Sequence, residues 1–475
     1  MQRAGFCGII SVDMTSRELV RKVEKSKMAV HTPAPYLERG VIYQINPRAF
    51  TNEGTLSAAA RMIPHMADIG VDIIYLCPVF TADPDERREF WSTRTKASKL
   101  ENPKNPYRIS DYYSIDPEYG TIDDLTDFTA RAHENGMRVI LDLVYYHCGP
   151  NAVFIADHPN WIKRLPDGTP DVGEWHYPKL NYDDPELCEY MARNMEFFVE
   201  KCDVDGYLCD VGDMVPIDFW RMGTERIRKI KPDVMMLNEG TRPEHLSVFD
   251  LNYGWYLRDL FTGCVIDGKP VSTFADGQRS FSERNLQGTY QSMVLLENHD
   301  SVNDDYDNRL EKRVGKKAFD AGLVVNYTLP NVPFIYNGTE VCDTNRHSIW
   351  GNRFHGANLT IDWQNALTED GKDRMRLVRE LSGLRHSVPA LGMQASLEFG
   401  KADNEHVLVY TREFDGTKVA VIVNFSDKPV RTVTDIESTD VDPMMMRGAA
   451  VAVSGTEGKL SVVLDGYGFA IVGLV

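Results

Sequence analysis

The chain of 475 residues is 43% hydrophobic and 26% charged, a composition typical of a globular protein with one large domain and a smaller one. Its formal net charge of −18 argues against binding a nucleic-acid backbone, which requires clustered Lys and Arg. No apolar run is long enough to span a membrane. The N-terminal apolar stretch is too brief for a convincing signal peptide, and none of the eight cysteines forms a CxxC pair, so we expect free thiols and a cytoplasmic location.

Residues 1–33 are predicted to form an N-terminal arm. Within it, Thr15 and Glu18 have the spacing of a capping box, which predicts a helix over about 16–28.

From residue 34 to 390, short apolar runs of strand length alternate with helix-length segments. Among the helical patterns, 122–135 begins after Thr121 and ends at Gly136, and 185–201 has Asp184 as its N-cap. Apolar strands separated by helices indicate a parallel sheet covered by helices on its outer side. Eight such strands are predicted, at 41–46, 71–76, 138–144, 206–210, 234–238, 247–251, 293–297 and 332–336.

Eight strands are the number that a closed (β/α)₈ TIM barrel requires, so we assign an α/β fold with this barrel to 34–390. A doubly wound open sheet is the alternative, weakened by the absence of GxGxxG and GxxxxGK[ST] motifs. The long connections after the second and third strands are a charged loop at 81–106 and a short Pro/Gly/Trp-rich subdomain at about 148–184, both placed to form or cover a site. Period-two alternation then predicts an antiparallel β-sandwich domain at 391–475.

Four of the predicted strands carry a carboxylate at or near their carboxyl ends. Asp210, Glu239 and Asp300 directly follow apolar runs, whereas Asp142 lies inside its strand with His147 just beyond it. Parallel strands place their carboxyl ends at one edge of a sheet, so we expect these side chains to converge there.

Seven segments occur in a fixed order: VIYQINPRAFTNEGT (41–55), NPYRISDYYSIDPEYGT (105–121), DLVYYH (142–147), GYLCD (206–210), NEG (238–240), ENHD (297–300) and PNVPFIYNGTE (330–340). In combination they resemble the α-amylase superfamily of glycoside hydrolases (family 13) over roughly 38–475. The resemblance implies a long-loop barrel followed by a β domain. It also implies hydrolysis of α-glucosidic bonds in malto-oligosaccharides or related α-glucans, without a cofactor.

Carried over residue by residue, the resemblance makes Asp210 the nucleophile, Glu239 the general acid/base and Asp300 the transition-state stabiliser. Such retaining hydrolysis needs one ionised carboxylate to attack the anomeric carbon and one protonated acid for the departing oxygen. Crowding of like charges raises one pKa, which would keep Glu239 protonated while Asp210 is ionised. The residues that the resemblance places around the sugar are Tyr107, Asp142, His147 and His299.

Leu208 departs from the family pattern, because the residue two before the nucleophile is nearly always Arg there. Without that Arg, Asp210 lacks its nearest cation and should be harder to ionise. Asp213 adds a further negative charge, which acts in the same direction. A compensating cation from elsewhere is one interpretation, with Arg48 or Arg108 as candidates; impaired catalysis is the other.

Two other departures concern specificity and metal binding. Tyr146 stands where many members have an Asn that helps bind calcium, so we expect no calcium at that position. Arg108 replaces an Asp common in exo-acting α-glucosidases, which argues against a simple α-glucosidase.

Three functions remain open: an amylase-like hydrolase, an α-glucan transglycosylase, and a catalytically impaired carbohydrate-binding homologue. The expected partner is an oligosaccharide or α-glucan, with no nucleic acid and no membrane. Linkage, chain length, endo or exo action and oligomeric state are not determined by the sequence.

Overall fold

The computed structural model describes residues 29–304, 309–354, 359–454 and 458–475, so the helix predicted at 16–28 lies outside the described residues. Eight parallel strands close into a barrel in the order β1-β10-β9-β8-β7-β6-β5-β2, which confirms the (β/α)₈ prediction over the open sheet. The barrel strands are β1 (Ile42–Ile45), β2 (Ile73–Leu76), β5 (Arg138–Leu143), β6 (Gly206–Cys209), β7 (Met235–Asn238), β8 (Leu251–Gly254), β9 (Ser292–Val294) and β10 (Val332–Tyr336).

Strand β8 is displaced from its predicted position at 247–251. The apolar residues before it belong to or follow a short 3₁₀ helix, η5 (Pro243–Ser247), and pack outside the barrel. The carboxylate of Asp250 accepts hydrogen bonds from the backbone N–H groups of Met236 and Ala34, at 2.8 and 2.9 Å, which fixes where the strand begins. An apolar run alone could not distinguish these two uses of the segment.

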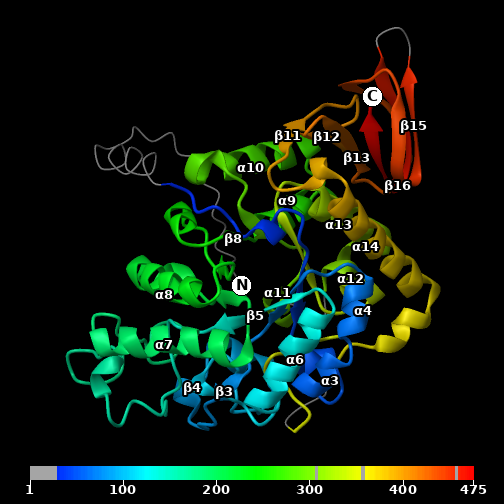
Figure 1. Cartoon of the computed structure of the whole chain (residues 1–475). Coiled ribbons are helices and arrows are strands. Elements are labelled where there is room, and N and C mark those ends of the chain that lie inside the picture. The colour runs from blue at the N-terminus through cyan, green and yellow to red at the C-terminus, as the bar shows by residue number, and fades with distance from the viewer. Residues whose placement is uncertain (1–28, 305–308, 355–358, 455–457) are drawn as a thin grey trace.

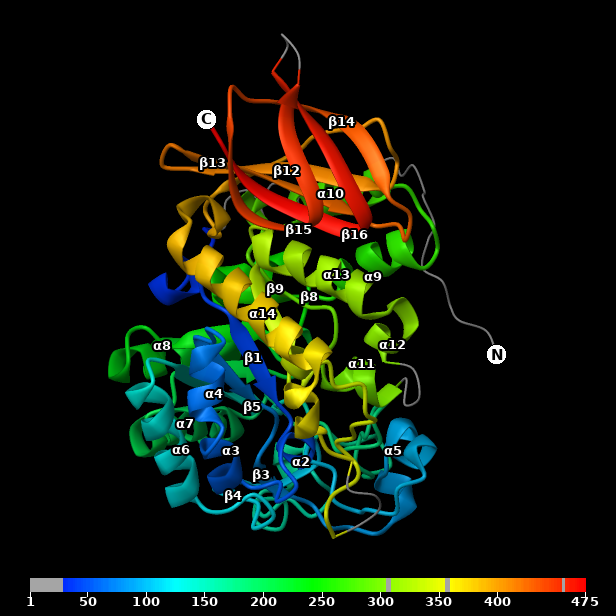
Figure 2. The same cartoon turned by 90° about the vertical axis from the view of Figure 1, so that its right-hand side faces the viewer.

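Helices surround the barrel on its outer side (Figures 1 and 2). A capping box between Thr121 and Asp124 opens α6, and the Asp184 side chain accepts from the N–H of Glu186 at the start of α7, as predicted for both N-termini. The principal helices are α3 (Leu56–Ala60), α4 (Ile63–Asp68), α6 (Ile122–Glu134), α7 (Pro185–Cys202), α8 (Ile217–Ile230), α9 (Tyr256–Val265), α10 (Val271–Arg284), α12 (Leu310–Val314), α13 (Lys316–Thr328) and α14 (Glu369–Ser387).

Alternate strand residues point into the barrel and fill it with apolar side chains. Leu208 of β6 belongs to this interior and is in register with Asp142 of β5. Polar side chains enter only near the carboxyl ends, where Gln44 and Asp142 stand two positions beyond Ile42 and Ile140 on the inner face. The interior cluster includes Ile42, Ile73, Tyr75, Ile140, Leu208, Met235, Leu237, Leu251, Tyr253, Met293, Leu295, Val332, Phe334 and Tyr336.

The C-terminal strands form an antiparallel domain that stands above the barrel in Figure 2. All six belong to one hydrogen-bonded sheet, and the register between β15 and β16 shifts between Arg447 and Ala449, where Gly448 has a left-handed backbone conformation with φ of +53°. Strands β13 and β16 contact α13, and alternate residues of the strands form a second apolar cluster that is separate from the main core. The strands are β11 (Ser396–Phe399), β12 (Val407–Phe414), β13 (Thr417–Asn424), β14 (Val430–Glu437), β15 (Val441–Ser454) and β16 (Lys459–Leu474).

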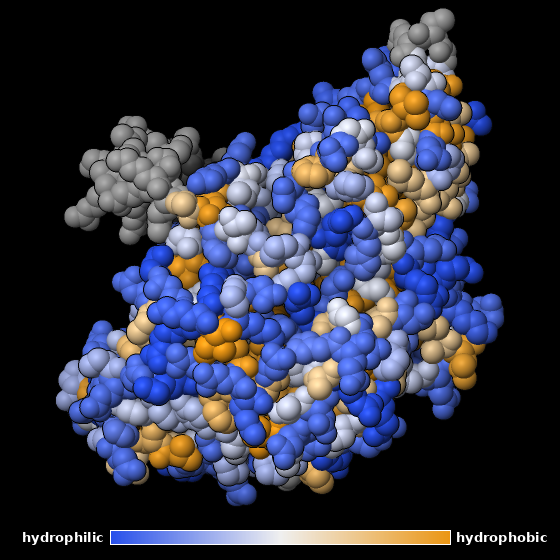
Figure 3. All heavy atoms as spheres, viewed as in Figure 1, coloured by the Kyte–Doolittle hydropathy of each residue, from blue (hydrophilic) through white to orange (hydrophobic). Residues whose placement is uncertain are grey.

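The face of the molecule in Figure 3 is mainly hydrophilic, with hydrophobic atoms in small patches over the barrel and on the C-terminal sheet. Within the described ranges, no helix combines the length and the apolar character needed to cross a membrane.

The buried side chain of Arg374 fastens α14 to the barrel. Its guanidinium donates to Glu311 of α12 at 3.0 Å and also pairs with Asp320 of α13. Removing one member of a buried ion cluster leaves its partners unpaired, so we expect Arg374→Met to lower the free energy of unfolding by about 3–5 kcal/mol. Arg376→Met, an exposed position on the same helix, should change it by less than about 0.5 kcal/mol. Urea unfolding of both variants measures this, and equal losses would contradict the assignment.

Candidate active site

The predicted acids meet at the carboxyl ends of the barrel strands. Asp210 follows β6 directly, Glu239 follows β7 directly, and Asp300 lies in the first turn of α11 (His299–Asp304) after β9. All three line a cavity of about 150 Å³. The other lining residues are Ser92, Arg94, Asn105, Tyr107, His147, Trp175, Tyr177, Val211, His299, Ile349 and Trp350.

A chain of hydrogen bonds supports the floor of the cavity. Gln44 accepts from the backbone N–H of His299 at 3.0 Å, so its amide nitrogen faces the Nδ1 of that ring at 2.6 Å. In the neutral imidazole the proton therefore sits on Nε2, which lies 2.7 Å from the hydroxyl of Tyr107. Tyr107 and Tyr75 both donate to one carboxylate oxygen of Asp142, at 2.9 and 2.6 Å.

These hydrogen bonds fix the positions of three predicted site residues, Tyr107, Asp142 and His299. Asp142 lies beneath the cavity and supports Tyr107, whose ring stacks on His299 with 5.6 Å between centroids. The second oxygen of Asp142 is buried and has no hydrogen-bond partner among the described residues.

His147 is held in the wall of the cavity. Its Nε2 donates to the carbonyl of Tyr107 at 2.9 Å, and its ring packs against Trp175 and Tyr177. Burial lowers the pKa of His147 to about 4, so the imidazole is neutral near pH 7 and its Nδ1 carries a lone pair. Trp161, from the same 148–184 segment as Trp175 and Tyr177, packs against Phe154 and does not line the cavity.

Asp210 and Glu239 are both buried, and their negative charges repel each other. Burial, then the charges of Glu239 and Asp142, raises the pKa of Asp210 well above its usual range. Burial, followed by the charge of Asp300, raises the pKa of Glu239 to about 7. With a pKa of about 7, Glu239 is partly protonated near neutral pH, and a negative charge on either carboxyl group is unfavourable at this buried position.

Neither Arg48 nor Arg108, the two cations predicted to compensate for Leu208, pairs with Asp210. Arg108 is buried and donates to four backbone carbonyls of the 81–106 loop, including those of Asp83 and Asp85 at 2.8 and 2.7 Å. Arg48 pairs with Glu118 at 2.9 Å. Among the described residues, no Lys, Arg or His forms an ion pair with Asp210.

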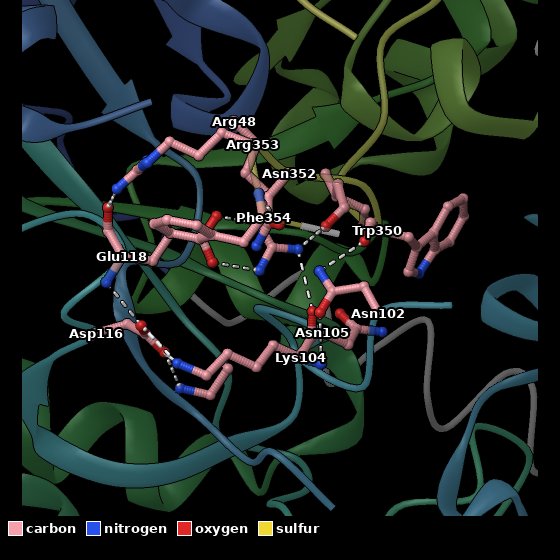
Figure 4. A network of polar contacts seen from close by, with 12 residues as sticks. Arg48, Asn102, Lys104, Asn105, Asp116, Glu118, Trp350, Asn352, Arg353 and Phe354 are labelled. Atoms are coloured by element: carbon pink, nitrogen blue, oxygen red, sulfur yellow. Dashed lines mark hydrogen bonds and ion pairs between the residues drawn. The ribbon is translucent and has the colours of Figure 1, made fainter. Parts of the chain in front are cut away.

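Arg48 instead joins two loops that build one wall of the cavity (Figure 4). Besides Glu118, it donates to the carbonyls of Lys104 and Ile349. Nearby, Asn102 donates to the carbonyl of Trp350 at 2.8 Å. These contacts tie the loop before β4 (Ile109–Ile115) to the loop after β10, so that Ile349 and Trp350 line the same cavity as the three acids.

The cation at this site is Arg94, from α5 (Thr93–Ser98) in the charged loop. It donates to Asp300 at 2.7 Å, and its guanidinium lies 5.4 Å from the centroid of the Trp350 ring. Burial opposes ionisation of Asp300, but His299 and Arg94 hold its pKa below the usual value. Sequence reasoning missed Arg94 because the loop contains several Arg residues and no pattern selects one of them.

The contact of Arg94 with the acids has a measurable consequence. Arg94 lowers the pKa of Glu239, so in Arg94→Gln that pKa should rise further above 7, by up to about one unit. Activity that requires protonated Glu239 should then persist to higher pH, and the alkaline limb of the kcat/KM profile should shift upward. Arg87→Gln, an exposed position in the same loop, is the control and should leave that limb in place. An unchanged limb in Arg94→Gln would contradict the electrostatic role.

The structure describes no group of three or more His, Cys, Asp or Glu side chains arranged to hold a metal ion. At the position considered for calcium, the ring of Tyr146 packs edge-on against Trp175, with 5.7 Å between centroids.

Carboxylates and aromatic side chains gathered at the carboxyl rim of a (β/α)₈ barrel are characteristic of glycoside hydrolases. The family model "Alpha amylase, catalytic domain" matches residues 40–163, and "Maltogenic Amylase, C-terminal domain" matches 397–471. The chain therefore resembles enzymes of the α-amylase superfamily in both of these segments, in agreement with the resemblance that the sequence motifs predicted.

Curated relatives and solved structures agree with this assignment. A cyclomaltodextrinase from a Bacillus species is 25% identical over 87% of this chain and 77% of its own length. A second cyclomaltodextrinase, from Thermoanaerobacter pseudethanolicus, is 24% identical over 79% of this chain and 64% of its own length. In fold, the chain is similar to a maltogenic α-amylase from Thermotoga neapolitana, with a TM-score of 0.77, 24% identity and coverage of 92% and 99% of the two chains.

Proposed function

We propose that this protein is a retaining glycosidase that acts on α-glucosidic bonds of malto-oligosaccharides or related α-glucans. The observation that carries the proposal is the single cavity lined by Asp210, Glu239 and Asp300. The relatives named cyclomaltodextrinase and α-amylase support the substrate class.

In the proposed reaction, Asp210 is ionised and Glu239 carries a proton when the sugar is bound. Glu239 donates it to the glycosidic oxygen while Asp210 attacks the anomeric carbon and forms a glycosyl ester. Water then enters and Glu239 removes a proton from it. The water oxygen bonds to the anomeric carbon as the bond from that carbon to Asp210 breaks, which releases the sugar. Asp300 provides fixed negative charge for the oxocarbenium-like transition state, and its contact with Arg94 keeps it ionised.

A transglycosylase is the second candidate, because similar chains include an α-1,4-glucan:maltose-1-phosphate maltosyltransferase from Picrophilus torridus, 22% identical over 83% of this chain. Here a sugar hydroxyl, instead of water, would lose its proton to Glu239 and take the glycosyl unit. A catalytically impaired binding protein is the third candidate, supported by the missing ion pair at Asp210.

The purified chain incubated with maltotriose and with a cyclomaltodextrin separates these candidates. Proton NMR during the first turnovers should show an α-anomeric product if the configuration is retained, and a β-anomeric product would contradict the mechanism. Chromatography that reveals chains longer than the substrate would favour transfer. Binding of the sugar by calorimetry without turnover would favour the third candidate.

A further inference from the structure

Asp213 joins the loop after β6, which carries Asp210, to the loop after β7, which carries Glu239. One of its oxygens accepts from the side-chain amide of Asn238 at 3.0 Å. The other accepts from the backbone N–H groups of Thr241 and Arg242, at 2.9 and 3.2 Å. Asp213 therefore binds the chain on both sides of Glu239, one residue before it and two to three residues after it.

A second hydrogen bond joins the same two loops, with its donor in the loop after β6 and its acceptor in the loop after β7. The backbone N–H of Val211, directly after Asp210, donates to a carboxylate oxygen of Glu239 at 3.0 Å. Val211 presents this N–H from a left-handed conformation, with φ of +39° and ψ of +43°, which is costly for a β-branched residue. Surrounding contacts must hold Val211 in this conformation, and the hydrogen bonds of Asp213 are made only two residues further along the chain.

The two loops approach too closely for side chains at their glycines. A Cβ added to Gly240 would lie 2.2 Å from the Oδ1 of Asp213, and one added to Gly212 would lie 2.3 Å from the Oδ1 of Asn238. The Asn238 amide also donates to Asn252 of β8 at 2.9 Å, which anchors the arrangement to the barrel. The loops after β6 and β7 therefore form one packed unit.

We propose that Asp213 is a positioning residue for Glu239, which it holds at the orientation required to protonate the glycosidic oxygen. This inference rests on the proposed function and extends it to a residue that lines no part of the cavity. A carboxylate suits the role because it accepts all three hydrogen bonds, whereas an amide would direct N–H groups at either Asn238 or the backbone donors. Buried His245 lies 3.3 Å from Asp213 and is the titratable side chain that contacts it within the described part of the chain.

Leaving-group dependence tests the proposal. Fluoride departs from an α-glucosyl fluoride without protonation, whereas the sugar that leaves maltotriose needs the acid. A misplaced acid should therefore lower kcat/KM for maltotriose in Asp213→Asn by about 10- to 100-fold, and that for the fluoride by less than about 2-fold, since attack by Asp210 is retained. Both values report the first irreversible step, so the later hydrolysis of the ester does not affect them.

Asp218→Asn is the matched control, because Asp218 is exposed in the first turn of α8 and makes none of these contacts. Asn238→Ala removes one of the three donors, should show the same selective loss to a smaller degree, and decides the matter if Asp213→Asn does not fold. Equal losses on both substrates would reduce Asp213 to a structural residue and overturn the inference, as would no loss on either. If the wild-type protein cleaves neither substrate, the proposed function fails as well.

Discussion

Asp210→Asn is expected to lower kcat/KM for maltotriose by at least about 10³-fold, since the amide cannot form the glycosyl ester. The variant should fold normally. Asp210 is buried beside Glu239 and Asp142, and its raised pKa means that its negative charge is unfavourable in the folded protein. Removing that charge should leave the thermal unfolding midpoint unchanged or higher, as is common for strained active sites. Steady-state kinetics and a thermal melt measure both effects.

Glu239→Gln provides the companion measurement, which separates the two roles. Its loss on maltotriose should be about 10²–10⁴-fold, the range that a general acid contributes. On α-glucosyl fluoride, formation of the ester should be nearly normal while its hydrolysis is slow, so the covalent intermediate should accumulate on Asp210 and be detectable by mass spectrometry. Retained turnover of maltotriose in either variant would refute the assignment of these residues.

Leu208→Arg is expected to raise activity on the acid side of the pH profile, by about 10-fold per unit of pKa shift. The proposed reaction requires ionised Asp210 and protonated Glu239, and the raised pKa of Asp210 would place the acid limb of kcat/KM at a higher pH than for an ordinary Asp. A guanidinium at position 208 favours the ionised form, so the acid limb should move to lower pH. Because the pair is coupled, the alkaline limb near the pKa of Glu239, about 7, should also move down.

The barrel interior offers a partner for the new side chain. Leu208 is 1% exposed, and Asp142, in register with it, has a buried oxygen with no described hydrogen-bond partner. Leu208→Met keeps the volume without the charge and is the control, expected to retain the wild-type profile. If Leu208→Arg folds but both limbs stay in place, the missing cation does not limit this enzyme.

The tertiary structure determined features for which the sequence carries no distinguishing pattern. Strand β8 begins at Leu251 because Asp250 bonds to backbone groups of residues 236 and 34, which are remote in sequence. The fold of its loop places Arg94 beside Asp300. Of the two sequence candidates, Arg48 pairs with Glu118, and Arg108 donates to backbone carbonyls. The role of Asp213 likewise depends on where two loops meet.

The sequence by itself determined the barrel, the C-terminal antiparallel strands, the caps of α6 and α7, and the resemblance to the α-amylase superfamily. These features depend on period, on short-range spacing and on acids placed directly after strands, all of which are local. Parallel strands then bring Asp210, Glu239 and Asp300 to one rim whatever the loops do. Partners of charged side chains are chosen by long-range packing, so electrostatics around the acids could be settled only in three dimensions.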